Sequence, residues 1–282
     1  RILDRTNAIM SLEKLGFGTE NEQKIKSLIR RPHGMIIVTG PTGSGKTTTL
    51  YSVLTELNNP NRNIITLEDP VEYSLPGINQ VQINTKAGLT FPAGLRAILR
   101  QDPDIIMVGE MRDGETAELG VRAALTGHLF FSTLHTNSSA GTIARMVNMG
   151  IENYLLSSSL VGVVSQRLIR RLCKNCSKPY QLDEETAVRL KIPEYAGKQF
   201  YAPTGCNMCR QSGYLGRMAL HEVMEVGMET RKAITNNIQS EDELEEIAVG
   251  EGMITMSMDG VQKAALGLTS LQEVMRGVYL GG

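Results

Sequence analysis

The segment Gly40–Thr47 limits the possible folds of this 282-residue chain more than any other segment. It reads Gly-Pro-Thr-Gly-Ser-Gly-Lys-Thr, a complete match to the pattern G-x-x-x-x-G-K-[ST]. The apolar run Met35–Thr39 precedes it, and a helical pattern follows from Thr48. Glycines in such a turn let successive backbone N–H groups converge on a phosphate at the positive end of a helix. Strand, loop and helix in this order predict a nucleoside triphosphate site.

The candidate nucleotide-binding residues are those of the loop and the residue after it: Gly40, Pro41, Thr42, Gly43, Ser44, Gly45, Lys46, Thr47 and Thr48. In a loop of this kind the lysine ammonium lies by the β- and γ-phosphate oxygens, and the next hydroxyl can ligate Mg²⁺. These roles fall to Lys46 and Thr47. A glycine-rich turn that binds nothing is the alternative, and the complete match between a strand and a helix argues against it.

The rest of the first half alternates between two patterns. Short β-rich runs recur at Gly34–Thr39, Asn63–Leu67, Gln80–Ile83, Asp104–Val108 and Leu129–Leu134. Helical patterns lie between or after them, at Lys46–Leu57, Pro92–Leu99, Gly114–Leu125 and Ala140–Met149. This alternation predicts an α/β fold with a mostly parallel sheet. Beyond residue 150 the pattern changes: Ile151–Leu172 is interpreted as mainly helical, and residues 229–282 as three or four short helices, the last capped at Thr269.

Composition and charge exclude several classes of protein. Hydrophobic residues make up 41% of the chain and charged residues 21%, so neither disorder nor a coiled coil describes the whole. The longest apolar runs fall far short of the ~20 residues that span a bilayer, so no transmembrane segment is expected. The 29 Lys and Arg residues balance 30 Asp and Glu residues, which disfavours a broad electrostatic grip on a phosphate polymer.

Acidic residues follow two of the expected strands. Glu110 ends the run that begins at Ile105, and Glu68 and Asp69 end the run from Ile64. A carboxylate at the carboxyl edge of a strand, beside a phosphate loop, can order metal-bound water or activate the attacking water. The alternative for Glu68 and Asp69 is an acidic turn in solvent. His135 follows the strand expected at Leu129–Leu134, and a lone histidine there is more often packed in the core.

Three further segments, in this order along the chain, carry a resemblance to a known family. In the type II secretion and type IV pilus assembly ATPases, the corresponding segments are called the Asp box, the Walker B segment and the His box. Thr66–Tyr73 resembles the Asp box, Leu99–Asp113 the Walker B segment and Gly127–Asn137 the His box. The resemblance extends over nearly the whole chain. It implies a RecA-like, ring-forming hexameric motor that couples ATP hydrolysis to the assembly of pilin-like subunits.

The resemblance also implies roles and partners. Glu110 corresponds to the residue that activates water, Glu68 to an acidic partner of the metal and its waters, and His135 to a His-box position near the γ-phosphate. Such motors are cytoplasmic, peripheral at the inner face of the cell membrane, and act on an inner-membrane platform protein. They carry an N-terminal domain that supplies arginines. The chain begins at Arg1 without a methionine, which suggests that such a part precedes it.

All four cysteines fall into two pairs, Cys173/Cys176 and Cys206/Cys209. Two residues separate the members of each pair, so both thiolates can bind one tetrahedral ion, and four thiolates complete its coordination. The spacing predicts a structural zinc site. Two disulfides are the alternative and would require an oxidising compartment. In the family that the chain resembles, this motif is found in secretion and pilus-extension ATPases, whereas retraction motors generally lack it.

The expected organisation is a RecA-like P-loop ATPase core at residues 1–170, a tetracysteine zinc-binding insertion at 171–212, and a C-terminal strand and helical subdomain at 213–282. A RecA-like nucleic-acid motor, either a DNA translocase or a helicase, is the alternative function. It would use a basic cluster comprising Arg167, Arg170, Arg171, Lys174 and Lys178. Net charge and the 5% aromatic content argue against it, so no direct nucleic-acid contact is expected. A third possibility is a scaffold that binds ATP without hydrolysing it.

Overall fold

The computed structural model describes residues 10–238 and 240–279, and the chain divides into two compact units. The first unit contains the chain up to Gln166 together with His221–Ile254, and the second contains Arg167–Leu220 and the chain from Thr255 onward. Within the described residues no helix combines the length and apolar character needed to cross a membrane.

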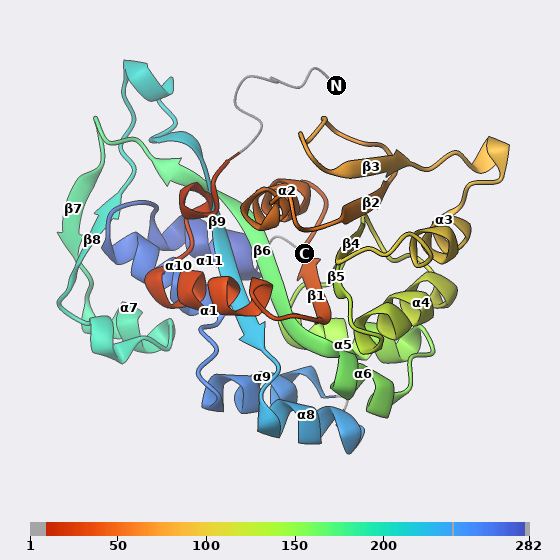
Figure 1. The fold of residues 1–282 in the computed structure, drawn as a ribbon. Coiled ribbons are helices and arrows are strands. Elements are labelled where there is room, and N and C mark those ends of the chain that lie inside the picture. Colours follow the sequence, from red (N-terminus) through yellow and green to blue (C-terminus); the bar gives the residue numbers. More distant parts are fainter. Residues whose placement is uncertain (1–9, 239, 280–282) are drawn as a thin grey trace. The chain divides into compact units, whose positions relative to one another are not determined.

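A seven-stranded sheet has the order β3-β2-β4-β5-β1-β6-β9 (Figure 1). Its strands are β1 (Gly34–Thr39), β2 (Ile64–Glu68), β3 (Asn79–Gln82), β4 (Ile105–Val108), β5 (Leu129–Leu134), β6 (Leu160–Leu172) and β9 (Tyr214–Glu225). The five pairings from β3 across to β6 are all parallel. Strands β1, β2, β4 and β5 are buried along their whole length, as expected for apolar runs covered on both faces. The five strands expected from the sequence are confirmed, three of them with ends displaced by one residue.

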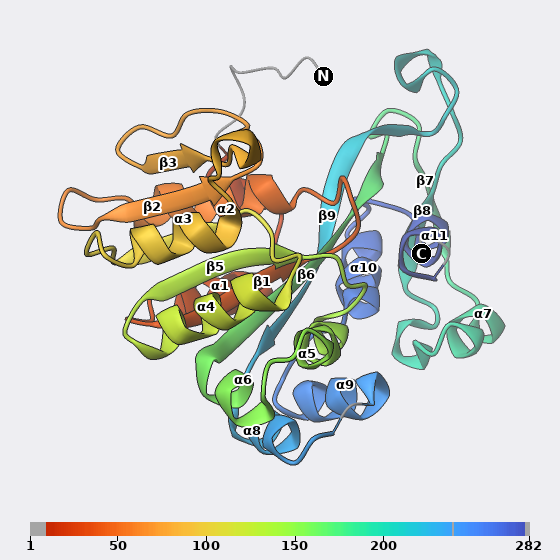
Figure 2. The ribbon, with the colours of Figure 1, turned by 90° about the vertical axis from the view of Figure 1, so that its right-hand side faces the viewer.

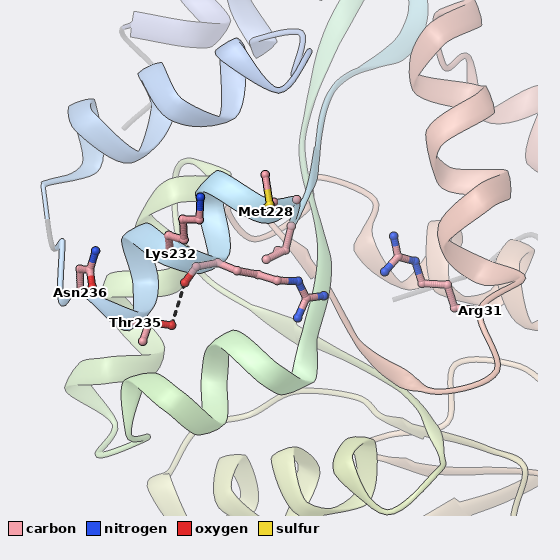
Figure 3. Close-up of a pocket in the computed structure, with 8 residues that line it drawn as sticks. Arg31, Met228, Lys232, Thr235 and Asn236 are labelled. Carbon is pink, nitrogen blue, oxygen red and sulfur yellow. Dashed lines mark hydrogen bonds between the residues drawn. The ribbon is translucent and has the colours of Figure 1, made fainter.

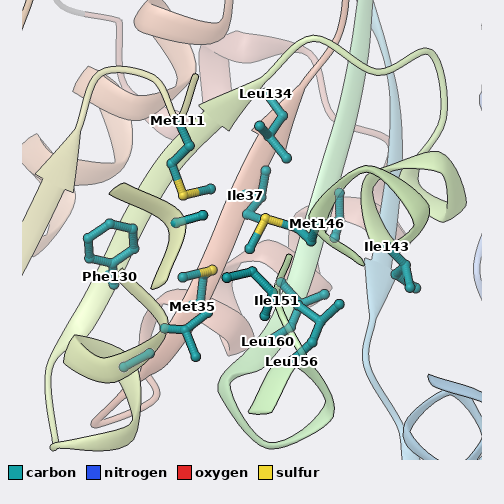
Figure 4. Close-up of a cluster of buried hydrophobic side chains, with 14 of the residues drawn as sticks. Met35, Ile37, Met111, Phe130, Leu134, Ile143, Met146, Ile151, Leu156 and Leu160 are labelled. Atoms are coloured by element: carbon teal, nitrogen blue, oxygen red, sulfur yellow. The ribbon is translucent and has the colours of Figure 1, made fainter. Parts of the chain in front are cut away.

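Helices cover both faces of the sheet within the first unit (Figure 2). Successive residues of β1 point to opposite faces: Ile36 and Val38 pack with Leu28 of α1 and Leu50 of α2. Met35 and Ile37 belong to a second cluster, which includes Phe130, Met111 and Leu156 (Figure 4). The helices of this unit are α1 (Thr19–Ile29), α2 (Lys46–Leu57), α3 (Phe91–Ile98), α4 (Gly114–Leu125), α5 (Ser139–Asn148), α6 (Asn153–Ser159), α8 (Met228–Thr235) and α9 (Glu241–Gly250).

The prediction of a mainly helical segment over Ile151–Leu172 is wrong. Helix α6 ends at Ser159, and the chain continues at once as the thirteen-residue strand β6. The residues after Ser159, Leu-Val-Gly-Val-Val, are rich in β-branched side chains and pair with β1. Gly162 lets Leu28 of α1 pack closely on this strand, because a Cβ there would lie 2.5 Å from a methyl group of Leu28. The start of the basic cluster therefore lies on a strand.

In the described residues, the second unit contains the end of β6 (from Arg167), the start of β9 (to Leu220), two short strands and three α-helices. β7 (Lys178–Gln181) and β8 (Gln199–Ala202) pair antiparallel, and the helices are α7 (Glu184–Arg189), α10 (Met256–Ala265) and α11 (Leu271–Tyr279). Phe200, Leu220 and Val274 belong to its buried core. In the described part of 229–282, α8 to α11 confirm the expected short helices. The predicted cap of α11, Thr269, is one residue too early: Ser270 Oγ accepts from the Glu273 backbone N–H at 3.2 Å.

Glu273 provides a test of stability in the second unit. Burial would raise the pKa of its carboxyl, but hydrogen bonds from Arg170 and Arg276 outweigh burial and lower that pKa to about 2. A folded-state pKa below the unfolded value of ~4.3 stabilises the fold above that pH, and the stabilisation is lost as pH falls toward 2. We expect Glu273→Gln to lower the free energy of unfolding at pH 7 by about 1.5–3 kcal/mol, the contribution of a hydrogen bond to a charged group.

Urea denaturation between pH 7 and pH 3 measures this effect, and the gap between Glu273→Gln and the parent should narrow below pH ~4.3. Glu229→Gln is the matched control, since Glu229 forms an exposed ion pair with Lys232 at 2.8 Å, and exposed pairs contribute ~1 kcal/mol or less. A pH-independent gap for Glu273→Gln would contradict the assigned ion pairs.

Candidate functional site

The loop Gly40–Thr47 leaves the carboxyl end of β1 and leads into α2. Gly40 has a φ of 140°, and a Cβ there would lie 2.3 Å from the Gln166 carbonyl oxygen, so only glycine fits. Gly45 precedes α2 with a φ of 94°, and no side chain caps the helix or places a carboxylate in its first turn. The first backbone N–H groups of α2 therefore remain available to an anion at the positive helix end.

The Lys46 side chain folds back over the phosphate loop. Its ammonium donates to the carbonyl oxygens of Gly40 at 2.7 Å and Pro41 at 3.1 Å, and lies 3.4 Å from Nδ1 of His135. Burial lowers the pKa of Lys46, and the Glu110 carboxylate opposes that shift. Thr42, Gly43 and Thr47 are exposed at the surface of the loop. Ser44, in contrast, is 3% exposed, and its hydroxyl has no hydrogen-bond partner within the described residues.

Glu110 follows β4 and lies beside His135, which follows β5. A Glu110 carboxylate oxygen is 3.6 Å from His135 Nε2, and the other is 2.6 Å from the Arg112 guanidinium. Thr133 Oγ1 donates to the Gly109 carbonyl oxygen at 2.7 Å, which joins the ends of the two strands. The structure thus brings Lys46, His135 and Glu110 together at the carboxyl edge of three neighbouring strands, the edge where parallel sheets bind ligands.

Glu68, at the end of β2, has a different environment from Glu110. Its side chain is buried and accepts hydrogen bonds from the Tyr51 hydroxyl, from Thr66 Oγ1 at 2.6 Å and from Gln80 Nε2 at 3.1 Å. Burial and the Glu68 carboxylate raise the pKa of Tyr51. Asp69, the next residue, is exposed. Tyr51 and Gln80 are not predicted as site residues from the sequence; they precede and follow Glu68 by 17 and 12 residues. No local pattern connects them.

The four cysteines form one cluster in the second unit. Their sulfur atoms all lie within 4.8 Å of one another, and three of the separations are 3.7, 3.8 and 3.9 Å. Four thiolates at ~2.3 Å from a tetrahedral zinc ion stand about 3.8 Å apart, so the cluster fits zinc. The cysteines are free thiols, which does not support the disulfide alternative. A hydrogen bond from the Asn175 side chain is the main cause that lowers the pKa of Cys206 to about 6.

Comparison with known proteins places the chain in a family. Residues 1–276 match the family model described as "Type II/IV secretion system protein". The chain belongs to this family. The "Putative type II secretion system protein E" of Escherichia coli (strain K12) is 51% identical over 276 residues, which are 98% of this chain and 56% of that protein. The "Type IV pilus assembly ATPase PilB" of Thermus thermophilus is 48% identical over 277 residues, covering 98% and 31%.

Solved structures related to this type II/IV secretion system protein agree in fold. The pilus retraction motor PilT with bound ADP has a TM-score of 0.71 and 31% identity, over 95% of this chain and 66% of PilT. The ATPase DotB of Legionella pneumophila has the same TM-score at 23% identity, over 98% and 66%, and supports the fold alone. The chain spans about half the length of the type II secretion relatives that it matches.

A separate pocket of about 550 Å³ lies in the first unit of this family member, between the end of β9 and helix α8 (Figure 3). It contains none of the candidate residues. Its cations already have partners: Arg31 is paired with Glu225, Arg231 donates to the Ser157 carbonyl oxygen at 2.6 Å, and Lys232 is paired with Glu229. Two of the three cations that line the pocket are therefore in ion pairs, and the third, Arg231, is hydrogen-bonded to a neutral carbonyl group.

Proposed function

We propose that this chain is the ATP-hydrolysing module of a motor for type IV pilus assembly or type II protein secretion. The observation that carries the proposal is the grouping of Lys46, His135 and Glu110 beside an uncapped α2. Relatives named for type II secretion and pilus assembly, at 48–51% identity, support the choice of machine.

In the proposed reaction, the backbone N–H groups of residues 40–48 and the Lys46 ammonium bind the phosphates of ATP. A water attacks the γ-phosphorus, the new O–P bond forms, and the bond to the β,γ-bridging oxygen breaks, so that ADP leaves with the electron pair. Glu110 orients this water and accepts its proton. His135, which lies between Lys46 and Glu110, would face the γ-phosphate. Glu68 assists by holding the end of β2 in place through its hydrogen bonds with Tyr51 and Thr66.

Two metal ions belong to the proposal. Thr47, exposed in the first turn of α2, would ligate Mg²⁺, and the ion would neutralise phosphate charge. Glu68, the proposed acidic partner of the metal and its waters, is buried and already accepts three hydrogen bonds, so it would act through this network and not as a direct ligand. Cys173, Cys176, Cys206 and Cys209 would hold one structural zinc ion, which leaves no open position for catalysis.

The remaining parts of the proposal concern organisation. The full-length protein would be a homo-hexamer at the cytoplasmic face of the inner membrane, acting on the platform protein of its machine. Residues 1–170 would be the RecA-like core, 171–212 the zinc-binding segment and 213–282 the C-terminal subdomain, of which His221–Ile254 belong to the same compact unit as the core. An additional domain outside this chain would supply arginines to the site; the type II secretion relatives are nearly twice as long as the chain, which leaves room for such a domain.

Phosphate release by the purified chain, with Mg²⁺ or EDTA and with or without DNA, tests this function. We expect phosphate release that depends on Mg²⁺ and does not change when DNA is added. A many-fold rise with DNA and a steep salt dependence would favour the nucleic-acid motor instead. Two cations of the basic cluster already have partners, since Arg167 donates to the Gly277 carbonyl oxygen and Arg170 is paired with Glu273. Stoichiometric ATP binding without phosphate release, both by this chain and by a longer chain that includes the additional domain, would indicate the non-hydrolysing scaffold.

A further inference from the structure

Gln166, on β6, makes three close approaches to the phosphate loop and the helix after it. Its side-chain amide donates to the Ser44 carbonyl oxygen at 2.8 Å, and its side-chain oxygen accepts from Thr49 Oγ1 at 2.8 Å. Its backbone carbonyl oxygen lies 2.3 Å from the position that a Cβ of residue 40 would take, which is too close for any residue but glycine. Gln166 is 1% exposed, so all three contacts are in the interior of the first unit.

The Thr49 contact departs from the pattern of its own helix. Two other hydroxyls of α2 bond back along the helix, the buried Ser52 to the Thr48 carbonyl oxygen at 2.8 Å and the exposed Thr55 to the Tyr51 carbonyl oxygen at 2.7 Å. Such back-bonding is the ordinary choice of Ser and Thr inside a helix. Thr49 instead donates across to β6. The helix start and the loop before it are therefore both attached to one glutamine side chain.

The Ser44 contact holds the loop directly before Gly45 and Lys46. Backbone N–H groups bind phosphate well only when they converge, and their direction depends on the peptide planes of the loop. Gln166 fixes the carbonyl group of Ser44, and thereby the peptide plane that also carries the Gly45 N–H. We propose that Gln166 is a positioning residue that holds the phosphate loop in its nucleotide-binding conformation; this inference rests on the proposed function.

Two substitutions separate positioning from simple core filling. Gln166→Glu keeps the size and the acceptor for Thr49, but its ionised carboxylate has no proton to donate to the Ser44 carbonyl oxygen. Because burial favours the protonated acid, which could still donate, binding is measured at pH 7 and pH 9. Thr49→Val removes only the hydroxyl on the other side and leaves the Ser44 contact. Ser52→Ala is the matched control, because it removes a hydroxyl from the same helix whose hydrogen bond stays within the helix.

The measurement is the Kd for Mg·ATP, together with KM and kcat. We expect Gln166→Glu to weaken ATP binding by about 10- to 100-fold, since displacements near 1 Å can have effects of that size. Thr49→Val should weaken it by a smaller factor, and Ser52→Ala should bind as the parent does. The zinc content should not change in any variant, which reports an intact second unit. A purely structural role would lower the melting temperature without changing the Kd.

The inference is overturned if folded Gln166→Glu and Thr49→Val both bind ATP as Ser52→Ala does. If Gln166→Glu does not fold, Thr49→Val against Ser52→Ala decides the question alone. Failure of the proposed function has a different signature, because the unsubstituted chain itself would then neither bind nor hydrolyse ATP.

Discussion

Glu110→Gln is expected to bind ATP as the parent chain does while phosphate release falls by a factor of about 10²–10⁴, the usual contribution of a positioned base. The amide keeps the size of the side chain and can still accept from Arg112, so the end of β4 should keep its geometry. It cannot accept the proton of the attacking water at neutral pH. Binding of a fluorescent ATP analogue and phosphate release, measured on one preparation, separate the two effects.

Two further variants bracket this result. Lys46→Ala removes the ammonium from the phosphate loop and should lose binding itself, so its turnover falls for a different reason. Glu118→Gln changes a carboxylate on α4 that is 51% exposed and paired with Arg122, and should leave both binding and turnover unchanged. Near-normal turnover in Glu110→Gln would remove this carboxylate from the mechanism and turn attention to Glu68 or to His135.

The sequence predicted the parts of this fold that depend on local patterns. Strands such as Met35–Thr39 and Ile105–Val108 are fully buried, and their apolar runs show this directly. The phosphate loop has a motif with a fixed spacing, and the carboxyl ends of parallel strands meet at one edge, so Lys46, His135 and Glu110 could be expected together. The cysteine spacing likewise predicted a single four-sulfur cluster.

Contacts that depend on distant segments could not be predicted in this way. The helix predicted over Ile151–Leu172 is wrong for β6: its first residues, Leu-Val-Gly-Val-Val, favour a strand, but the Ser, Gln, Arg and Leu that follow suit either structure, and pairing with β1 decides between them. A role for Gln166 becomes visible only in the folded structure, where β6 lies beside a loop that precedes it by more than 120 residues in the sequence. The buried environment of Glu68 has the same origin, since its partner Gln80 lies on the neighbouring strand β3.

Cys206→Ser is expected to lose stoichiometric zinc and to destabilise the cysteine-bearing segment. Binding of zinc to four-ligand structural sites is worth roughly 10–16 kcal/mol at pH 7, so one thiolate of four accounts for about 2.5–4 kcal/mol, or a 10²- to 10³-fold loss of affinity. Although Cys206 is only half-buried, we expect this full loss of zinc affinity, because its sulfur lies 3.7 Å from that of Cys209 and 3.9 Å from that of Cys173, within the cluster. Metal analysis after dialysis against a chelator measures it.

Met208→Ser is the control for this prediction, since Met208 lies in the same turn, is 66% exposed and contributes no ligand to the cluster. It should retain about one zinc ion per chain, the stoichiometry of a four-thiolate site. Hydrogen exchange then locates the effect: faster exchange in Cys206→Ser should be confined to the second unit, at Cys173, Gly213 and their neighbours, whose backbone groups pair at 3.0 Å. Since no cysteine lies in the first unit, ATP binding should persist in this variant. Full zinc retention by Cys206→Ser would show that the cluster does not hold the ion through four thiolates.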